Sequence, residues 1–453
     1  MNLKTIIFLL LTLCSAVIAQ GRGELVTITG DSLVGSNVGG ETIREIIGNV
    51  VLTQGNIRIT CNNALQYLAR NDAILTGNVV VTQNNLIIRA PKGSYFGDEK
   101  IAECHSGVQL EDGRVVLNAV NGNYYFNTQH ALFSKNVRLR DSVTTMTGDK
   151  LDYYRDEQKA VAVGGVVINS AANTISADTV VHFRDTRIST ADGNVRMDNK
   201  QNRVVVFSGH LEDYALRNYT LITEKPLLIQ TDSVKSADSD TLLISSVKME
   251  VFNDSTRKLI ATDSVKMVRG TFASKNEYSE YYRDKGVILT FKKNASQPQP
   301  VLWYGNSQLT GDSVSMKLEN NSLRLVESYN NAFILSANRI YPNRYDQMSG
   351  ELVKLHFDTS GITHTEVNGE VLSIYYTYDG DSANGLTRSS SQKAVILFAE
   401  NQVSRVNLYV SPVSEYYPEN LVEGKELSFT LPAFTIRTGR PEKKDLFSIV
   451  RCR

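Results

Sequence analysis

An internal repeat of 29 residues constrains the fold of this 453-residue chain more than any other feature of its sequence. A valine returns at this interval six times. The residue two positions after each valine is apolar, and the residue after that is polar. This alternation of period two is typical of β-strands with one buried face, whereas a helix needs a period of 3.6. The repeated valines are Val50, Val79, Val108, Val137, Val166 and Val195.

Further columns keep the same register. Small residues stand 11 positions after each of the first five valines, and aromatic residues follow six positions later, at Tyr67, Phe96, Tyr125, Tyr154 and Phe183. Most of the valines follow Gly or Asn, as in Gly48-Asn49 and Gly77-Asn78, and these residues tolerate positive φ. We therefore expect each repeat to begin at a tight turn. The repeat predicts an all-β stack in which each unit buries its apolar face against its neighbours.

The strict period ends after Val195, and a Lys225-Pro226 breaker follows. Looser echoes of the repeat, such as Leu309 to Val314, predict a second, degenerate block. From about residue 369 the sequence changes again: strands are expected at 371–376 and 395–398, a loop at 379–392, and a loose basic tail from Arg437 to Arg453. The predicted domains are therefore 20–225, 226–368 and 369–453.

The first 19 residues have the pattern of a secretory signal peptide. Lys4 provides the basic start, residues 6–13 are almost wholly apolar, and Val17-Ile18-Ala19 fits a cleavage site. The apolar run is too short to span a membrane. A lipoprotein with lipid on Cys14 is the alternative, but Leu13 is bulky for the residue before a lipid-modified cysteine. We expect the mature chain to begin near Gln20 and to be exported to the periplasm.

Charge and cysteine content exclude several classes. Lys plus Arg and Asp plus Glu both total 48, so no basic face for nucleic acid is indicated. The expected mature chain keeps Cys61, Cys104 and Cys452. An odd number argues against a disulfide framework in an oxidising compartment. Cys61 and Cys104 are interpreted as small core residues, with a bridge between them as the alternative.

Signatures of catalysis are missing from the sequence. It contains no Gly-x-Ser-x-Gly elbow, no His-Glu-x-x-His and no phosphate-binding loop. No two of its six histidines stand at a metal-ligand spacing. His210, close to Glu212 and Asp213, is the nearest approach to an acid–base cluster, and we interpret it as a loop contact. The prediction is a chain that is not an enzyme and needs no cofactor or metal.

The segment GNVVVTQNNLIIRAPKGSYF, from Gly77 to Phe96, and its counterparts GNVRMDN and ISADTVVHF resemble the OstA-like family of periplasmic lipopolysaccharide-transport proteins. The resemblance is clear from about Gly48 to Phe183 and weaker to about residue 360. It implies an antiparallel β-jellyroll, or β-taco, whose stacked repeats form two walls with an open groove. Acyl chains of lipid A would lie between the walls.

The resemblance also implies a function: a periplasmic lipopolysaccharide-binding bridge that shields acyl chains on the way to the outer membrane. Its partners would be lipopolysaccharide and other transport proteins with jellyroll domains, joined edge to edge, with a homo-oligomer as a further possibility and an indirect association with the outer membrane. The candidate groove residues are Val108, Leu110, Tyr125, Val137, Leu139, Tyr154, Val166, Ile168 and Phe183.

A secreted β-solenoid that binds polysaccharide, or a purely structural envelope protein, is the alternative. A solenoid lyase would need clustered acidic and basic residues on one strand face. The polar column of the repeat, Thr53, Thr82, Glu111, Arg140, Asn169 and Asp198, shows no such cluster.

Overall fold

The computed structural model describes residues 24–171, 173–201, 203–231, 241–319, 322–399 and 402–451. The predicted signal peptide lies outside these residues. The chain divides into two compact units, 1–164 and 165–453, and each unit is described by itself. Domain boundaries near residues 225 and 368 remain a prediction.

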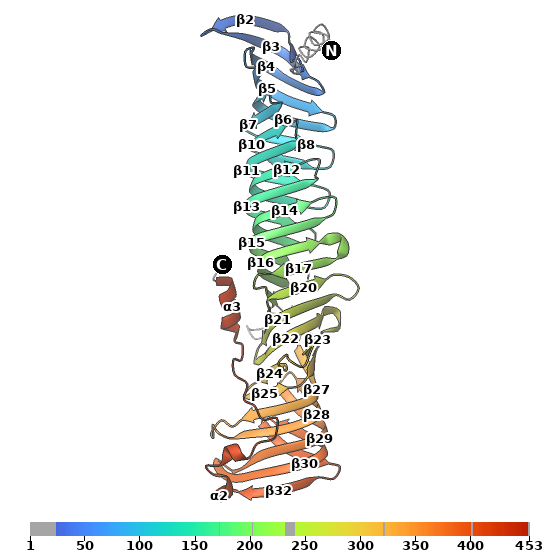
Figure 1. The fold of residues 1–453 in the computed structure, drawn as a ribbon, viewed down its shortest axis with the longest axis vertical. Coiled ribbons are helices and arrows are strands. Elements are labelled where there is room, and N and C mark those ends of the chain that lie inside the picture. The colour runs from blue at the N-terminus through green and yellow to red at the C-terminus, as the bar shows by residue number, and fades with distance from the viewer. Residues whose placement is uncertain are drawn as a thin grey trace, which may run out of the picture. The chain divides into compact units, whose positions relative to one another are not determined.

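Unit 1 contains twelve strands and the first part of a thirteenth (Figure 1). They are β1 (Thr27–Thr29), β2 (Ser32–Val38), β3 (Glu41–Gln54), β4 (Ile57–Tyr67), β5 (Asp72–Gln83), β6 (Leu86–Phe96), β7 (Ile101–His105), β8 (Val108–Glu111), β9 (Val116–Ala119), β10 (Asn121–Tyr125), β11 (His130–Arg140), β12 (Thr145–Tyr154) and β13 (Lys159–Asn169).

Unit 2 begins within β13 and continues with β14 (Asn173–Phe183), β15 (Ile188–Asn199), β16 (Val204–Tyr214), β17 (Tyr219–Thr223), β18 (Leu227–Gln230), β19 (Leu242–Ser245), β20 (Lys248–Phe252), β21 (Lys258–Arg269) and β22 (Phe272–Tyr282). Its later strands are β23 (Val287–Phe291), β24 (Val301–Tyr304), β25 (Ser307–Thr310), β26 (Ser313–Glu319), β27 (Ser322–Ala337), β28 (Tyr345–Asp358), β29 (Gly361–Asp379), β30 (Ser382–Ala399), β31 (Gln402–Tyr409) and β32 (Val413–Pro418). Helices are α2 (Glu419–Val422) and α3 (Lys443–Arg451), with 3-10 turns at Ala215–Arg217, Arg283–Lys285 and Glu426–Ser428.

Most long strands cross a corner that divides them between two walls. In the pairing of β3 with β4, residues 43–47 face 63–67, the register then shifts, and residues 50–54 face 57–61. The same shift recurs in the pairs β4–β5, β5–β6 and β11–β12. We call the arm that contains Tyr67 wall A and the arm that contains Gln54 wall B. The strand pairs among the described residues are antiparallel, so the prediction of an all-β, antiparallel fold is confirmed.

The corner is formed by the Gly-Asn pairs of the repeat. Gly48 and Asn49 have φ of 77° and 46°, and Gly77 and Asn78 have 79° and 52°. Two successive residues in this left-handed region favour Gly and Asn, because a β-carbon clashes there in most other residues. Both pairs lie inside continuous strands, β3 and β5, at the register shift. The prediction of a tight turn was therefore wrong, because the pair makes a β-bulge rather than a strand-ending turn.

Unit 2 keeps this corner with different residues. Asp263 and Ser264 in β21, Asn330 and Asn331 in β27, and Gly369 and Glu370 in β29 are again successive residues with positive φ at a register shift. The degenerate block therefore retains the geometry of the repeat where its sequence period is lost.

Two predictions for the last 75 residues were wrong. The expected loop at 379–392 lies almost wholly in β30, which pairs with β29 along most of its length. The expected loose tail is packed: Leu446 of α3 is 1% exposed and contacts Leu227, Leu243 and Trp303. Serine-rich composition indicated a loop at the first site, but pairing on both sides of β30 decides its structure.

We expect Gly77→Val to lower the free energy of unfolding by about 2 kcal/mol, since its β-carbon would adopt the left-handed region and would lie 2.7 Å from the Asn62 side chain. Gly35→Val, on exposed β2 with no atom within 4 Å of the new β-carbon, should change stability by less than about 0.5 kcal/mol. Urea unfolding of both variants measures the contrast. Equal effects would show that the corner does not need a left-handed residue.

Candidate functional site

The valine and leucine columns of the predicted groove point inward. In unit 1, Val108, Leu110, Val137 and Leu139 are at most 5% exposed. In unit 2, Val166 and Ile168 are buried as well. These side chains form the apolar lining between the walls, and their role in holding a ligand remains a proposal.

The structure places the predicted aromatic column on the outer face. Phe183 is 37% exposed, and the rings of Tyr125 and Tyr154 stack on either side of His130, with centroid distances of 5.4 and 4.4 Å. Their neighbours Tyr124 and Tyr153 point inward instead.

The corner explains this displacement. Along β6 the buried residues are Leu86, Ile88 and Ala90, and the next ones are Gly93 and Tyr95. The three-residue step from 90 to 93 reverses which residues face inward, because neighbouring residues of a strand point to opposite faces. If the alternation of period two is continued across the corner, it therefore predicts the wrong residues of wall A to face inward.

Tyr95 joins the free ends of the two walls in unit 1. Its hydroxyl donates a short hydrogen bond to Oε1 of Gln54, which ends the wall B arm of β3. The Gln54 amide donates to the carbonyl of Gly97, at the end of wall A, over 2.9 Å. Both side chains are buried, so these hydrogen bonds close unit 1 on the side opposite the corner.

The same closure recurs within unit 1, two 29-residue repeats further along the chain. The Tyr153 hydroxyl donates to Oδ2 of Asp112 over 2.7 Å, and both pairs are separated by 41 residues. Asp112 is 2% exposed, and its Oδ1 accepts hydrogen bonds from the backbone of Arg114 and Val115. Buried acceptors with this many donors hold the two wall ends firmly, because an unpaired carboxylate would be costly there. We call these contacts the tyrosine latch.

Unit 2 contains an apolar cavity of about 300 Å³ between its walls. This volume is at the lower end of those found for small-molecule pockets. Six apolar residues that line it are Trp303, Ile334, Leu355, Phe357, Ile362 and Ile396. They come from β24, β27, β28, β29 and β30, all within the degenerate block and the extension that follows it.

Asp346 is the ionisable acid in the lining of this cavity. Its carboxylate accepts a hydrogen bond from the backbone N–H of Tyr376 over 2.9 Å. Burial raises the pKa of Asp346 to about 7. Below that pH the carboxyl is neutral, so the cavity wall carries no full negative charge at this position.

The C-terminal segment runs back along the strands of unit 2 (Figure 1), and hydrogen bonds hold it beside the cavity. Gln308 and Gln347 both line the cavity. The Gln308 amide donates to the carbonyl of Thr435 over 2.7 Å, and the Gln347 amide oxygen accepts from the backbone of Leu431 over 2.8 Å. At the start of this segment, Glu419 of α2 forms an ion pair with Arg344, whose side chain is 3% exposed. The segment therefore packs along the wall ends through specific polar contacts.

The two other sequence candidates have structural roles. Cys61 and Cys104 are free and buried, and burial raises the pKa of their thiols to about 11 and about 12. His210 contacts Asp192 over 2.6 Å and Glu212 over 3.1 Å. Burial acts to lower the pKa of His210, but these hydrogen bonds raise it overall. Asp213 points to the opposite face and accepts from Thr220, so it is not part of that cluster.

Sequence reasoning missed the tyrosine latch and the cavity. The latch had a signal: Tyr95, Tyr124 and Tyr153 follow the same 29-residue interval one position before the column that was chosen. The cavity had none, because its residues lie where the repeat has lost its period.

We expect Tyr153→Phe to lower the free energy of unfolding by about 1–3 kcal/mol, since buried Asp112 would lose one of its donors. Tyr154→Phe removes the same hydroxyl from the outer face and keeps the stacking on His130, so its effect should stay below about 0.5 kcal/mol. Chemical denaturation compares the two. A Tyr153→Phe variant as stable as Tyr154→Phe would rule out a stabilising latch.

A comparison with protein families agrees with the resemblance of the repeat. The model of the OstA-like protein family matches residues 25–121 and 74–206. No curated protein matches the chain. Among solved structures, one match is the crystal structure of LptH, the LptA homologous periplasmic component of the conserved lipopolysaccharide transport device from Pseudomonas aeruginosa. It has 13% identity and a TM-score of 0.15, and covers 38% of this chain and 83% of that one. Among the described helices, none combines the length and apolar character needed to span a membrane. Residues 25–206 of this chain are therefore similar to the OstA-like protein family.

Proposed function

We propose that this protein is a periplasmic member of the lipopolysaccharide-transport proteins that holds lipid acyl chains between its two walls. The single observation that carries the proposal is the apolar cavity within unit 2, between walls that keep the corner of the repeat. The OstA-like family model matches that repeat at residues 25–206. The buried valine, leucine and isoleucine candidates, such as Leu139 in unit 1 and Ile168 in unit 2, provide apolar side chains of the same kind.

An acyl chain needs such a site because its exposure to water has a high free-energy cost. Leaving one CH₂ in water costs about 0.8 kcal/mol, so a chain of about 12 carbons costs on the order of 10 kcal/mol. A lipid therefore needs an apolar partner to cross an aqueous compartment. A uniform lining of valine, leucine and isoleucine offers that partner without one deep site that would trap the chain.

The two units differ in whether the space between their walls is closed or partly empty. The tyrosine latch holds the wall ends of unit 1 together, whereas unit 2 has free volume beside Trp303. Acyl chains would fill the cavity of unit 2 directly. In unit 1 they would have to displace the latch, whose hydrogen bonds are polar and reform in water at moderate cost.

Assembly through strand edges is the second part of the proposal. β2 is exposed along its whole length, and β3 is its partner in the described structure. An unpaired edge offers N–H and C=O groups for strand addition. Val51 and Leu52 of the neighbouring β3 have strand partners on both sides, so they offer no free edge and β2 is the better candidate. The partner would be a second jellyroll, either another transport protein or another copy.

Trp303 is the only tryptophan of the chain and reports on the cavity without any mutation. We expect lipid A that carries brominated acyl chains to quench its fluorescence, because bromine quenches only at close range. In the control, Trp303→Phe combined with Tyr416→Trp moves the reporter to an exposed outer position, and quenching should fall several-fold. Binding without quenching of Trp303 would exclude the cavity as the site.

Photo-crosslinkers extend the test to the candidate groove residues. A crosslinker at Leu139 or Ile168 should capture lipopolysaccharide, and one at the neighbouring Arg140 or Asn169 should not, since neighbours on a strand face opposite sides. If mass spectrometry of the purified protein finds no acyl lipid and none can be loaded, a structural envelope protein becomes the better interpretation.

Proline scanning tests the edge. Val34→Pro and Gly35→Pro remove N–H groups that point to opposite sides of β2, so one variant should weaken self-association, measured by sedimentation, several-fold with an unchanged circular dichroism spectrum. The other should disturb the pairing of β2 with β3. Self-association that survives both substitutions would contradict the edge proposal for a second copy, and the same pair can then be tested on jellyroll partners.

A further inference from the structure

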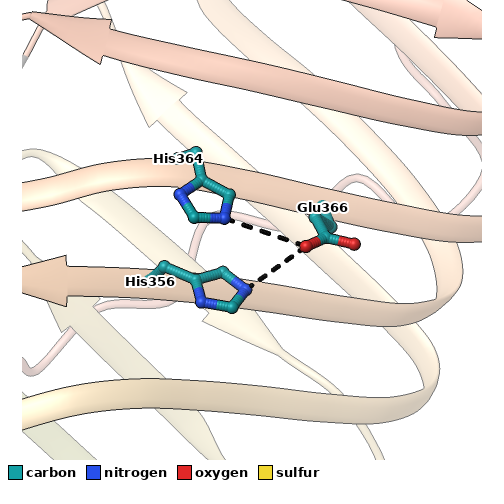
Figure 2. Close-up of side chains that lie close together, drawn as sticks. All are labelled: His356, His364 and Glu366. Atoms are coloured by element: carbon teal, nitrogen blue, oxygen red, sulfur yellow. Dashed lines mark ion pairs between the residues drawn. The ribbon is translucent and has the colours of Figure 1, made fainter.

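Two histidines and a glutamate converge on the outer face of unit 2 (Figure 2). His356 of β28 and His364 of β29 are direct cross-strand partners, and their rings stack with centroids 4.0 Å apart. Nε2 of His356 and Nε2 of His364 lie 3.5 and 3.8 Å from the same oxygen, Oε1 of Glu366. Three donor atoms on two adjacent strands thus point to one place.

A β-bulge brings the two rings together. Phe357 faces Ile362, but His356 faces His364, so Thr363 is an extra residue between them. Bulges of this kind re-aim side chains and are common beside functional sites. The Thr363 hydroxyl donates to the carbonyl of His356 over 3.1 Å and lies 3.1 Å from Nδ1 of His364.

These contacts orient the ring of His364. The Thr363 hydroxyl lies between the His356 carbonyl and Nδ1 of His364, so it holds the Nδ1 side of the ring. Nε2 of His364 is the ring nitrogen that faces Glu366 in Figure 2, 3.8 Å from Oε1. Metal-binding histidines are oriented in this way by a hydrogen bond to the other ring nitrogen.

His356 is also suited to bind a metal ion through Nε2. Its Nε2 is buried and makes no hydrogen bond within the described residues. Burial of the ring, followed by repulsion from His364, lowers the pKa of His356, which favours the neutral imidazole that binds metals. The side chains of the three residues remain 31–35% exposed, so the cluster lies at the surface, and an ion reaches the covered Nε2 of His356 when its ring turns.

We propose that His356, His364 and Glu366 bind a divalent transition-metal ion, with zinc the best match. Bonds of about 2.0–2.1 Å from a tetrahedral zinc place two ligand atoms about 3.3 Å apart. The Nε2–Oε1 distances of 3.5 and 3.8 Å are close to that value, and all three ligand atoms lie within 4.8 Å of one another. The two stacked rings would turn toward the ion to bind it. Imidazole and carboxylate are ligands that zinc accepts, and water would complete the tetrahedron.

The surrounding charges permit this ion at moderate affinity. Lys354 pairs with Glu327 over 2.9 Å, which neutralises it, and Lys393 lies 3.9 Å from the other oxygen of Glu366. Oε1 therefore stays available while Oε2 faces the lysine. Binding would clip β28 to β29 next to the bulge, and it is independent of whether the interior holds lipid.

The sequence hides this site because the spacing of eight residues suggests no metal motif. Residues 359 and 360 form the turn of the hairpin between β28 and β29. With the bulge at Thr363, residues 356 and 364 become opposite partners. The expectation that no histidine pair stands at a ligand spacing held only along the chain, not across strands.

Zinc titration of the chelator-treated full chain tests the proposal. Competition with a chromogenic chelator should reveal one zinc ion per chain, and His356→Asn, His364→Asn and Glu366→Gln should each weaken binding at least tenfold. His105→Asn provides the matched control: this histidine also faces solvent, with one glutamate 4.0 Å away, and its loss should leave the affinity unchanged. Binding should weaken as the pH falls, because protons compete with zinc for its ligand atoms.

Thermal unfolding gives a readout that does not depend on the chelator. Saturating zinc should raise the Tm of the wild-type chain and of His105→Asn, but not that of the His356→Asn/His364→Asn double variant, whose circular dichroism spectrum checks its fold. The proposal is overturned if the folded double variant binds zinc as tightly as wild type, or if wild type binds none, in which case the cluster holds only a proton.

Discussion

The corner between the two walls is the constraint on which the rest of this structure depends. Two successive residues with positive φ bend a strand and shift its register, and the shift recurs in strand after strand. Because every corner reverses the inward face, both walls can direct apolar side chains into one interior. Each strand forms backbone hydrogen bonds with the strands beside it. A corner that is not aligned with the corner of the next strand would therefore leave backbone N–H and C=O groups unpaired.

Closure and free volume are distributed unequally between the units. In unit 1 the interior is filled by residues such as Tyr95 and Tyr153, and their hydroxyls connect the wall ends through buried acceptors. In unit 2 the corresponding space beside Trp303 is partly empty, and the C-terminal segment packs along the wall ends.

The outer face has a chemistry of its own. Its stacked rings and ion pairs, such as those around His130 and Glu366, lie one residue away from the apolar interior. Alternation on a strand separates the two faces completely, so a metal ion bound outside need not disturb an acyl chain inside. The same strands can therefore serve an apolar and an ionic function at once.

The sequence by itself determined the class of fold, because a 29-residue period with apolar–polar alternation has few solutions other than a stack of strands. It also determined which valines and leucines face inward in wall B. Only the tertiary structure decided the face of Tyr125 and Tyr154, since the corner reverses the alternation between two residues that sequence treats as continuous. It alone placed His356 opposite His364, because strand pairing and a bulge bring these residues together. It alone packed Leu446 into unit 2, because the C-terminal segment folds back onto strands that are distant in sequence.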